Sequence, residues 1–159
     1  MKQIHNHEAG MALALCEAKK SLDRGEVPIG AVLVDQFGTV VSKGYNLVEH
    51  KTTQLAHAEA QAIAKANKKL KTWRLNGYWL YVTLEPCLMC LGLIQLSRID
   101  GICFGATSPL FGTGLGKTNL DFSFYEKRVH VISGVREQEC AELLKLFFKL
   151  TRAKKKGLS

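Results

Sequence analysis

The sequence has no apolar run long enough to cross a bilayer, and its first ten residues, MKQIHNHEAG, lack the apolar segment of a secretory signal. It has five cysteines, an odd number, and their spacing does not suggest a disulfide framework. These absences argue against a membrane-spanning or secreted protein, so we expect a cytoplasmic, reducing setting. In that setting, two cysteines three residues apart are typical of a metal or redox site.

Acidic residues are scarce: there are 14, against 22 lysines and arginines, and the formal net charge is +8. The end of the chain has no acidic residue from position 145 onward, but it has six basic ones: Lys145, Lys149, Arg152, Lys154, Lys155 and Lys156. Such a balance favours polyanionic partners, nucleic acid first among them. The basic segment, about residues 145–159, is predicted either to bind phosphate groups or to be a solvated helix end.

The chain shows no repeat and no linker, and its 159 residues suit a single domain over 1–159. Apolar and β-branched runs predict five strands, at IGAVLVD, TVVSKGYN, GYWLYVTLE, GICFGA and RVHVISG. Helical spacing predicts helices at about residues 5–24, in AHAEAQAIAKANKKL, in CLMCLGLIQLSR and around 140–147. The order of these elements predicts an α/β fold, a sheet between helices, with a parallel crossover from the third strand to the fourth.

One segment resembles a phosphate-binding loop but does not meet its requirements. In GTGLGKT, residues 112–118, the motif would need a glycine at position 111, which is Phe111, and no helical pattern follows. The surrounding glycine-rich stretch, residues 107–121, is predicted to be an ordinary loop.

The stretch TLEPCLMCLG contains Cys87 and Cys90 where a strand pattern gives way to a helix pattern. Their spacing places both thiols on one side of a first helical turn, where the helix dipole favours thiolates. The proline precedes the pair rather than separating it, which argues against a thioredoxin-like site. The other cysteines stand singly in apolar surroundings and are predicted to be small buried side chains: Cys16, Cys103 and Cys140.

His57 is the candidate third ligand, because it opens the helix that follows the first two strands. Three ligands leave the fourth position of a zinc ion open for water, which is typical of a catalytic site, and zinc can lower the pKa of that water to about 7. Glu59 points differently on the helix, so it is predicted to carry protons beside the metal rather than bind it. The alternative is that His57 caps a helix or fills the core and that Glu59 is a solvated charge.

H-x-E followed by P-C-x-x-C resembles the signature of zinc-dependent nucleobase deaminases. The phrases EVPIGAVLV, GYN, AHAE, LYVTLEPCLMC, SRI and FGA resemble the tRNA-specific adenosine deaminase branch of that superfamily. The resemblance implies a three-layer α/β/α cytidine-deaminase-like fold with a central five-stranded mixed sheet, one zinc per subunit and a homodimer. It also implies hydrolysis of the wobble adenosine of a tRNA anticodon to inosine, with release of ammonia and with Glu59 as the proton carrier.

The resemblance further assigns residues to the substrate. Asn46 matches a family asparagine that hydrogen-bonds the nucleotide, and the backbone N–H of Ala58 would contact the base. The residues implied as apolar walls of the pocket are Pro28, Ile29 and Leu84. By residue type alone, Asn46 could equally be a turn residue, and Pro28 and Ile29 could be plain core residues.

Phe147 and Phe148, beside Lys149 and Arg152, combine aromatic rings with cations that could grip splayed RNA. The alternative is that Phe147 packs inward and only the basic face meets RNA. Two stretches depart from the family pattern. Ser108 and Leu110 stand in FGATSPLFG where many relatives carry an acidic residue and a lysine, and KTTQLAHAE replaces a frequent Asp-Pro. Both departures concern the grip on RNA, and neither changes the zinc ligands or the proton carrier.

Two alternative functions belong to different classes. One is a deaminase of the same fold that acts on a free base or nucleoside such as guanine, cytosine or cytidine. The basic segment 145–159 argues against it, because a small-molecule enzyme has no use for six cations there. The other is a zinc-stabilised RNA-binding module without catalysis, against which the intact Glu59 and the three-ligand site argue.

Overall fold

The computed structural model of the chain describes residues 6–112 and 129–157. Five strands in this part form one sheet: β1 (Gly30–Val34), β2 (Val40–Tyr45), β3 (Trp79–Leu84), β4 (Gly101–Ala106) and β5 (His130–Ser133). Their spatial order is β2-β1-β3-β4-β5. β1 pairs antiparallel with β2 and with β3, whereas β4 pairs parallel with β3 and with β5. The mixed five-stranded sheet and the parallel crossover from β3 to β4 are therefore confirmed.

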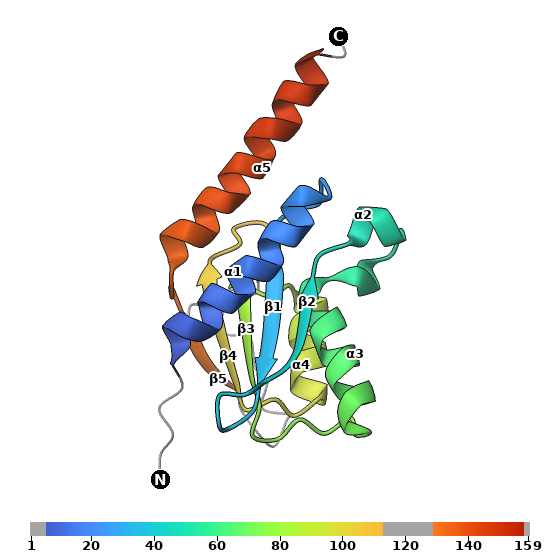
Figure 1. The fold of residues 1–159 in the computed structure, drawn as a ribbon, viewed down its shortest axis with the longest axis vertical. Helices are drawn as coiled ribbons and strands as arrows, with labels where there is room; N and C mark the ends of the chain where they lie inside the picture. The colour runs from blue at the N-terminus through green and yellow to red at the C-terminus, as the bar shows by residue number, and fades with distance from the viewer. Residues whose placement is uncertain (1–5, 113–128, 158–159) are drawn as a thin grey trace.

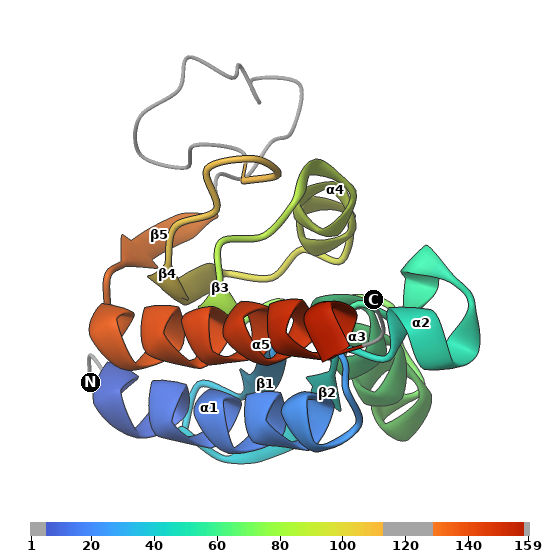
Figure 2. The ribbon, with the colours of Figure 1, turned by 90° about the horizontal axis from the view of Figure 1, so that it is seen from above.

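The helices are α1 (His7–Asp23), α2 (Val48–Lys51), α3 (Ala58–Leu70), α4 (Leu88–Leu96) and α5 (Glu137–Gly157), with a 3-10 turn η1 (Gln54–Ala56). α1 and α5 lie side by side on one face of the sheet, and α3 and α4 cover the other (Figure 1, Figure 2). This is the expected three-layer arrangement. α2 and η1 were not predicted, because segments of three or four residues show no hydrophobic periodicity.

Alternation along the strands divides the apolar side chains between two cores. Leu33, Leu80 and Ile102 point to the face covered by α3 and α4. Their chain neighbours Val32 and Tyr81 point to the face covered by α1 and α5. β1 and β4 are buried along their whole length, which explains why both are continuous apolar runs in the sequence.

Local side-chain and backbone features determine the ends of α1 and the turn between β1 and β2. Asn6 caps α1 by accepting a hydrogen bond from the Ala9 N–H at 3.0 Å, and Gly25 follows the helix with φ of +73°. In the turn between β1 and β2, the Asp35 carboxylate accepts hydrogen bonds from two backbone N–H groups, both at 2.8 Å. These contacts close the hairpin that the sequence predicted.

Two of the three single cysteines are buried as predicted, and one is not. Cys103 and Cys140 lie in the core under α1 and α5. The prediction for Cys16 is wrong, because it is exposed. Its neighbour Leu15 faces the core, so Cys16 is turned toward the outer side of α1.

α5 continues as a helix to Gly157, well beyond the predicted segment around 140–147. Cys140 is its one fully buried residue, and its C-terminal half extends past the sheet (Figure 1). The basic residues of segment 145–159 therefore stand on an exposed helix as far as the described residues reach. Over residues 6–112 and 129–157, none of the helices combines the length and apolar character of a membrane span. Of the predicted loop 107–121 and the segment GTGLGKT, residues after 112 lie outside the described residues.

Candidate active site

The N-termini of α3 and α4 meet at one edge of the sheet, as predicted. His57 is the N-cap residue of α3 and Cys87 is the N-cap residue of α4, and neither side chain caps its own helix. The His57 Nδ1 lies 3.7 Å from the Cys87 Sγ and 3.5 Å from the Cys90 Sγ. All three donor atoms lie within 4.8 Å of one another. The structure thus brings the three candidate ligands together from two separate helices.

The spacing of these atoms fits zinc. Zn–N and Zn–S bonds of about 2.1 and 2.3 Å at tetrahedral angles imply an N···S separation of about 3.6 Å. Both observed separations, 3.7 and 3.5 Å, are close to that value. One imidazole and two thiolates also form a donor set that suits zinc. In the described part of the chain, no further histidine, cysteine or carboxylate joins this group, so protein side chains account for three positions.

Glu59 and the thiols have strongly perturbed acidities. Glu59 is buried, and this burial raises the pKa of its carboxyl above the usual value, which favours the form that carries a proton. A hydrogen bond from Cys90, with a second from His57, lowers the pKa of the Cys87 thiol to about 4. The hydrogen bond to Cys87 raises the pKa of Cys90, so the pair keeps one proton that a bound metal must displace.

Gln54 holds the His57 ring, a role that the sequence patterns did not reveal. The Gln54 Oε1 lies 3.0 Å from the His57 Nε2. An amide oxygen accepts hydrogen bonds only, so Nε2 carries a proton, and Nδ1 is the ring nitrogen that faces the thiols and can bind a metal once it is deprotonated. Gln54 stands in η1, within the stretch that departs from the family pattern. Its only sequence signal is its position three residues before the histidine.

Gln54→Leu should weaken zinc binding by about 10- to 100-fold, the usual effect of losing the partner of a metal-binding histidine. The reason is that a leucine side chain cannot accept the Nε2 proton, so the ring can rotate or change tautomer. Zinc affinity would be measured by competition with a chromogenic chelator. Gln54→Glu is the matched control, because it keeps an acceptor at the same place and should retain affinity. Unchanged affinity in the leucine variant would contradict this role.

His57 and Cys87 line a cavity of about 840 Å³, within the range of about 300–1,000 Å³ that is usual for small-molecule sites. Glu59 lines it, together with three residues implied for the substrate: Asn46, Ile29 and Leu84. Pro28 and Ala58 are buried next to this region but are not among the lining residues. Of the five residues that the resemblance implied for the substrate, three thus line the pocket and these two do not.

The Asn46 side chain is held by backbone groups at the pocket wall. Its Nδ2 donates to the Val27 carbonyl at 3.1 Å, and its Oδ1 accepts from the Val48 N–H at 3.3 Å. The second of these bonds is the local contact typical of an asparagine in a turn. The structure thus shows the turn contact of Asn46, and its contact with a nucleotide stays a prediction.

Glu85 holds the loop that follows β4, and it was not predicted from the sequence. Its Oε2 accepts a hydrogen bond from the Ser108 N–H at 3.1 Å. Ser108, Leu110 and Phe111 line the cavity, and Leu110 is 86% exposed. The two positions that depart from the family pattern therefore lie at the rim of the pocket.

α5 reaches the same rim through Leu144 and Phe148. Phe148 lines the cavity, and the ring of Phe147 packs edge-on against it with 5.2 Å between centroids. Lys149 and Arg152 are exposed on α5 but are not among the lining residues. Of the three predicted RNA contacts, one thus belongs to the pocket and two lie along the helix beside it.

A protein-family model, the zinc-binding region of cytidine and deoxycytidylate deaminases, matches residues 4–106. The match spans most of the chain and contains all three candidate ligands and Glu59. The chain belongs to this deaminase family. The deaminase is 46% identical over 151 residues to the "tRNA-specific adenosine deaminase" of Bacillus subtilis (strain 168), with 94% of this chain and 93% of the relative covered.

Two solved structures resemble the deaminase in both fold and sequence. One comes from studies of A-to-I editing by tRNA:A34 deaminases at the wobble position of transfer RNA; it is 40% identical, with a TM-score of 0.78, and covers 85% of this chain and 98% of its own. The other is a guanine deaminase from Bacillus subtilis, 32% identical with a TM-score of 0.61, covering 79% and 83%. These likenesses confirm the cytidine-deaminase-like fold and the prediction of a hydrolytic deaminase with a zinc-binding domain.

Proposed function

We propose that the deaminase hydrolyses the wobble adenosine of a tRNA anticodon to inosine and releases ammonia. The observation that carries this proposal is the 46% identity to the tRNA-specific adenosine deaminase of Bacillus subtilis over nearly the whole of both chains. The identity to the guanine deaminase is lower, 32%. The basic segment 145–159 supports an RNA substrate, because phosphate groups contribute most of the affinity in such complexes.

Zinc held by His57, Cys87 and Cys90 would supply an activated water molecule at neutral pH. The protein's own groups move the protons. Glu59 takes a proton from the attacking water, delivers it to the ring N1 of adenine and later protonates the leaving amine. Its burial suits this exchange, because a desolvated carboxyl binds a proton more readily than one in water.

The pocket walls orient the base. Ile29 and Leu84 present apolar side chains that exclude water from the flipped adenine. Ala58 is the first residue of α3, so its N–H has no acceptor within the helix and is free to donate to the base. Asn46 is proposed to contact the nucleotide from the wall, and Pro28 supports that wall from behind.

α5 is proposed to grip the RNA outside the pocket. Phe148, half exposed at the rim, can stack on a splayed base. Lys149 and Arg152 lie farther along the same helix, where they can neutralise phosphates of the anticodon stem-loop. This arrangement would let one helix contact both a base and the backbone.

The function is tested with zinc-loaded protein and an anticodon stem-loop RNA that carries a wobble adenosine. Free adenosine, cytidine and guanine are offered in parallel, and products are identified by liquid chromatography and mass spectrometry. We expect inosine in the RNA and no deaminated small molecule. Xanthine from guanine, with no inosine in the RNA, would instead establish the free-base alternative that the guanine deaminase structure represents.

We further propose that the deaminase is a homodimer with one zinc per subunit. α4 carries large apolar side chains on its outer side: Leu88 is 64% exposed, Met89 41% and Leu96 62%. Gly92 lies between them on the helix, with open space where a Cβ would be. An exposed apolar face of this kind is typical of a protein interface. It also starts directly at the Cys87 end of α4, beside the pocket.

Leu96→Glu should convert the dimer to a monomer, because it places a charge in the proposed apolar interface, at the C-terminal end of α4. Molar mass would be measured by size-exclusion chromatography with light scattering. Phe37→Glu is the matched control, since Phe37 is 69% exposed at the turn between β1 and β2, away from α4. A wild-type monomer, or a dimer that survives Leu96→Glu, would contradict the proposed interface.

A further inference from the structure

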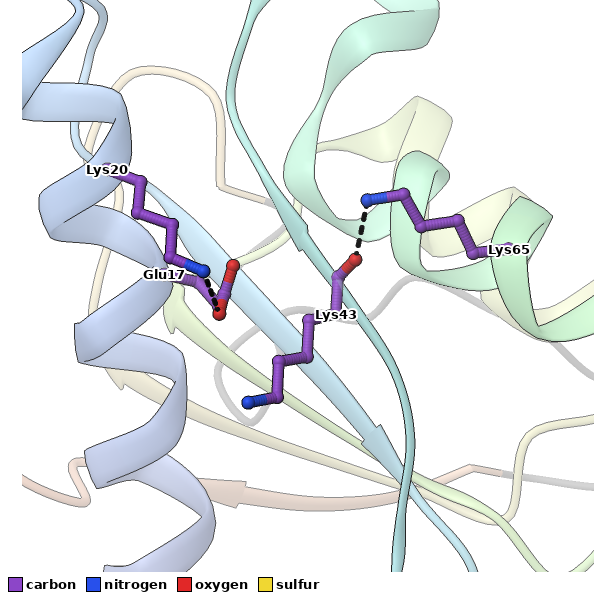
Figure 3. Close-up of polar contacts among 4 residues, drawn as sticks. All are labelled: Glu17, Lys20, Lys43 and Lys65. Carbon is purple, nitrogen blue, oxygen red and sulfur yellow. Dashed lines mark hydrogen bonds and ion pairs between the residues drawn. The ribbon is translucent and has the colours of Figure 1, made fainter.

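Three side chains of α3 bind the outer edge of β2. Among the described residues β2 is an edge strand, and its outward-facing carbonyls have no partner strand there. The hydrogen bonds run from Gln61 Nε2 to the Tyr45 carbonyl, from Lys65 Nζ to the Lys43 carbonyl at 2.9 Å and from Lys69 Nζ to the Val41 carbonyl at 3.3 Å. We call these contacts the α3 seam. Figure 3 shows its middle bond, with the Lys43 side chain itself pointing away from α3.

The register of the α3 seam follows from helix and strand geometry. The donors are four residues apart along α3, a rise of about 6 Å, and the acceptors are two residues apart along β2, about 6.6 Å. The two spacings nearly agree, so successive donors meet successive carbonyls with the helix antiparallel to the strand. The seam therefore fixes the helix along the strand as well as against it.

Gln61 differs from the two lysines in what else it holds. Its Nε2 also donates to the Ala56 carbonyl at 2.9 Å, and its Oε1 accepts from Lys51 Nζ at 3.1 Å. Tyr45 is the residue before Asn46, and Ala56 is the residue before the candidate metal ligand His57. The Gln61 amide thus joins the end of β2, η1 and α2 to the first turn of α3.

The first turn of α3 also packs directly against the backbone of β2 at Gly44. A Cβ at Gly44 would lie 2.2 Å from the Ala58 carbonyl oxygen and 3.1 Å from the Gln61 Cβ. Gly44 therefore permits the close approach, and Gln61 secures it from the side. In a close-packed contact of this kind, a small shift of the helix is passed on to the residues that it carries. Those residues include Glu59 and the candidate metal ligand His57 at the helix N-terminus.

We propose that Gln61 is a positioning residue for the active site. It ties the peptide groups before Asn46 and before His57 to the turn that carries Glu59, and so holds the pocket wall, the metal ligand and the proton carrier in one arrangement. Lys65 and Lys69 secure the same helix to the same strand farther from the pocket, so they stabilise the fold without setting this geometry. The activity readout of this inference rests on the proposed function, and its zinc readout does not.

The test compares Gln61→Met with Lys65→Met. Gln61→Met keeps the length of the side chain and removes its hydrogen bonds, whereas Lys65→Met removes one bond of the α3 seam at a distance from the pocket. For Gln61→Met we expect kcat on saturating stem-loop RNA to fall by about 10- to 100-fold, and zinc release to a chelator to be about tenfold faster. Lys65→Met should keep both at wild-type values, although both variants should melt at lower temperature than wild type.

Wild-type kcat and wild-type zinc release in Gln61→Met would overturn the positioning role, whatever its melting temperature. Equal losses in Lys65→Met would overturn it as well, because any broken bond between α3 and β2 would then suffice. If the wild-type protein leaves the RNA unchanged, the proposed function fails instead. The comparison of zinc release between the two variants then decides the positioning role by itself.

Discussion

Glu59→Gln should leave the deaminase folded and loaded with zinc but reduce turnover by about 10⁴-fold, the upper end of what one acid–base group contributes. The upper end is expected because the same carboxyl serves several proton transfers in succession. Glutamine has the same size and still fits the buried position, but it cannot release or take up a proton. Turnover would be measured as inosine formed in the stem-loop RNA, and zinc by elemental analysis of the purified variant.

The matched control is Glu17→Gln, at another buried glutamate. Glu17 lies on α1 and binds Lys20 at 2.8 Å (Figure 3), on the other face of the sheet from the site. Its loss should affect stability but not turnover. Two results would contradict the role given to Glu59: a Glu59→Gln variant without zinc, which would make Glu59 a ligand, and a zinc-loaded variant with unchanged turnover.

Gly44→Ala should both destabilise the deaminase and inactivate it. The added Cβ would lie 2.2 Å from the Ala58 carbonyl oxygen and 2.8 Å from the Ala62 N, and backbone atoms of a packed helix cannot move aside separately. We expect the free energy of unfolding to fall by about 3 kcal/mol, since overpacking against backbone belongs to the costlier cases. The N-terminus of α3 must shift to relieve the clash, which moves Glu59 and reduces turnover.

Urea unfolding of the zinc-loaded protein would measure the change in stability, and the RNA assay the change in turnover. Lys43→Ala is the control in the same strand, because its side chain is exposed and points away from α3 (Figure 3). Its unfolding free energy should stay within about 0.5 kcal/mol of wild type. Wild-type stability and turnover in Gly44→Ala would show that α3 is not seated on β2 in this way.

The parts of the fold that the sequence predicted are those with a repeated local signal. β4 occupies the predicted segment GICFGA residue for residue, because a strand buried on both faces is a continuous apolar run. The start of α4 at Cys87 could be placed because a strand pattern changes to a helical one just before it, and the start of α3 at His57 could be placed because an alanine-rich helical run begins there. With both helices on one face, the meeting of the three ligands followed.

The parts that the sequence did not predict depend on contacts between distant segments. Nothing local to Gln61 shows that its amide binds two carbonyls of other elements, one of them 16 residues earlier. The role of Gln54 likewise requires the ring of His57 to be placed first. Pro28, which the family resemblance implied as a pocket wall, is buried, and its place in that wall stays a prediction.

The catalytic residues and the proposed RNA contacts lie on parts of the molecule that differ in their tolerance to substitution. The ligands and Glu59 start helices that are packed into the core, whereas Ser108, Leu110 and Phe148 sit on an exposed rim. Mutations at such a rim cost little folding free energy, so an ancestral scaffold can acquire new substrates while its reaction is conserved. Guanine deaminases and tRNA deaminases with the same architecture are consistent with this history. Directed evolution aimed at new RNA substrates should therefore randomise the rim and leave the N-termini of α3 and α4 intact.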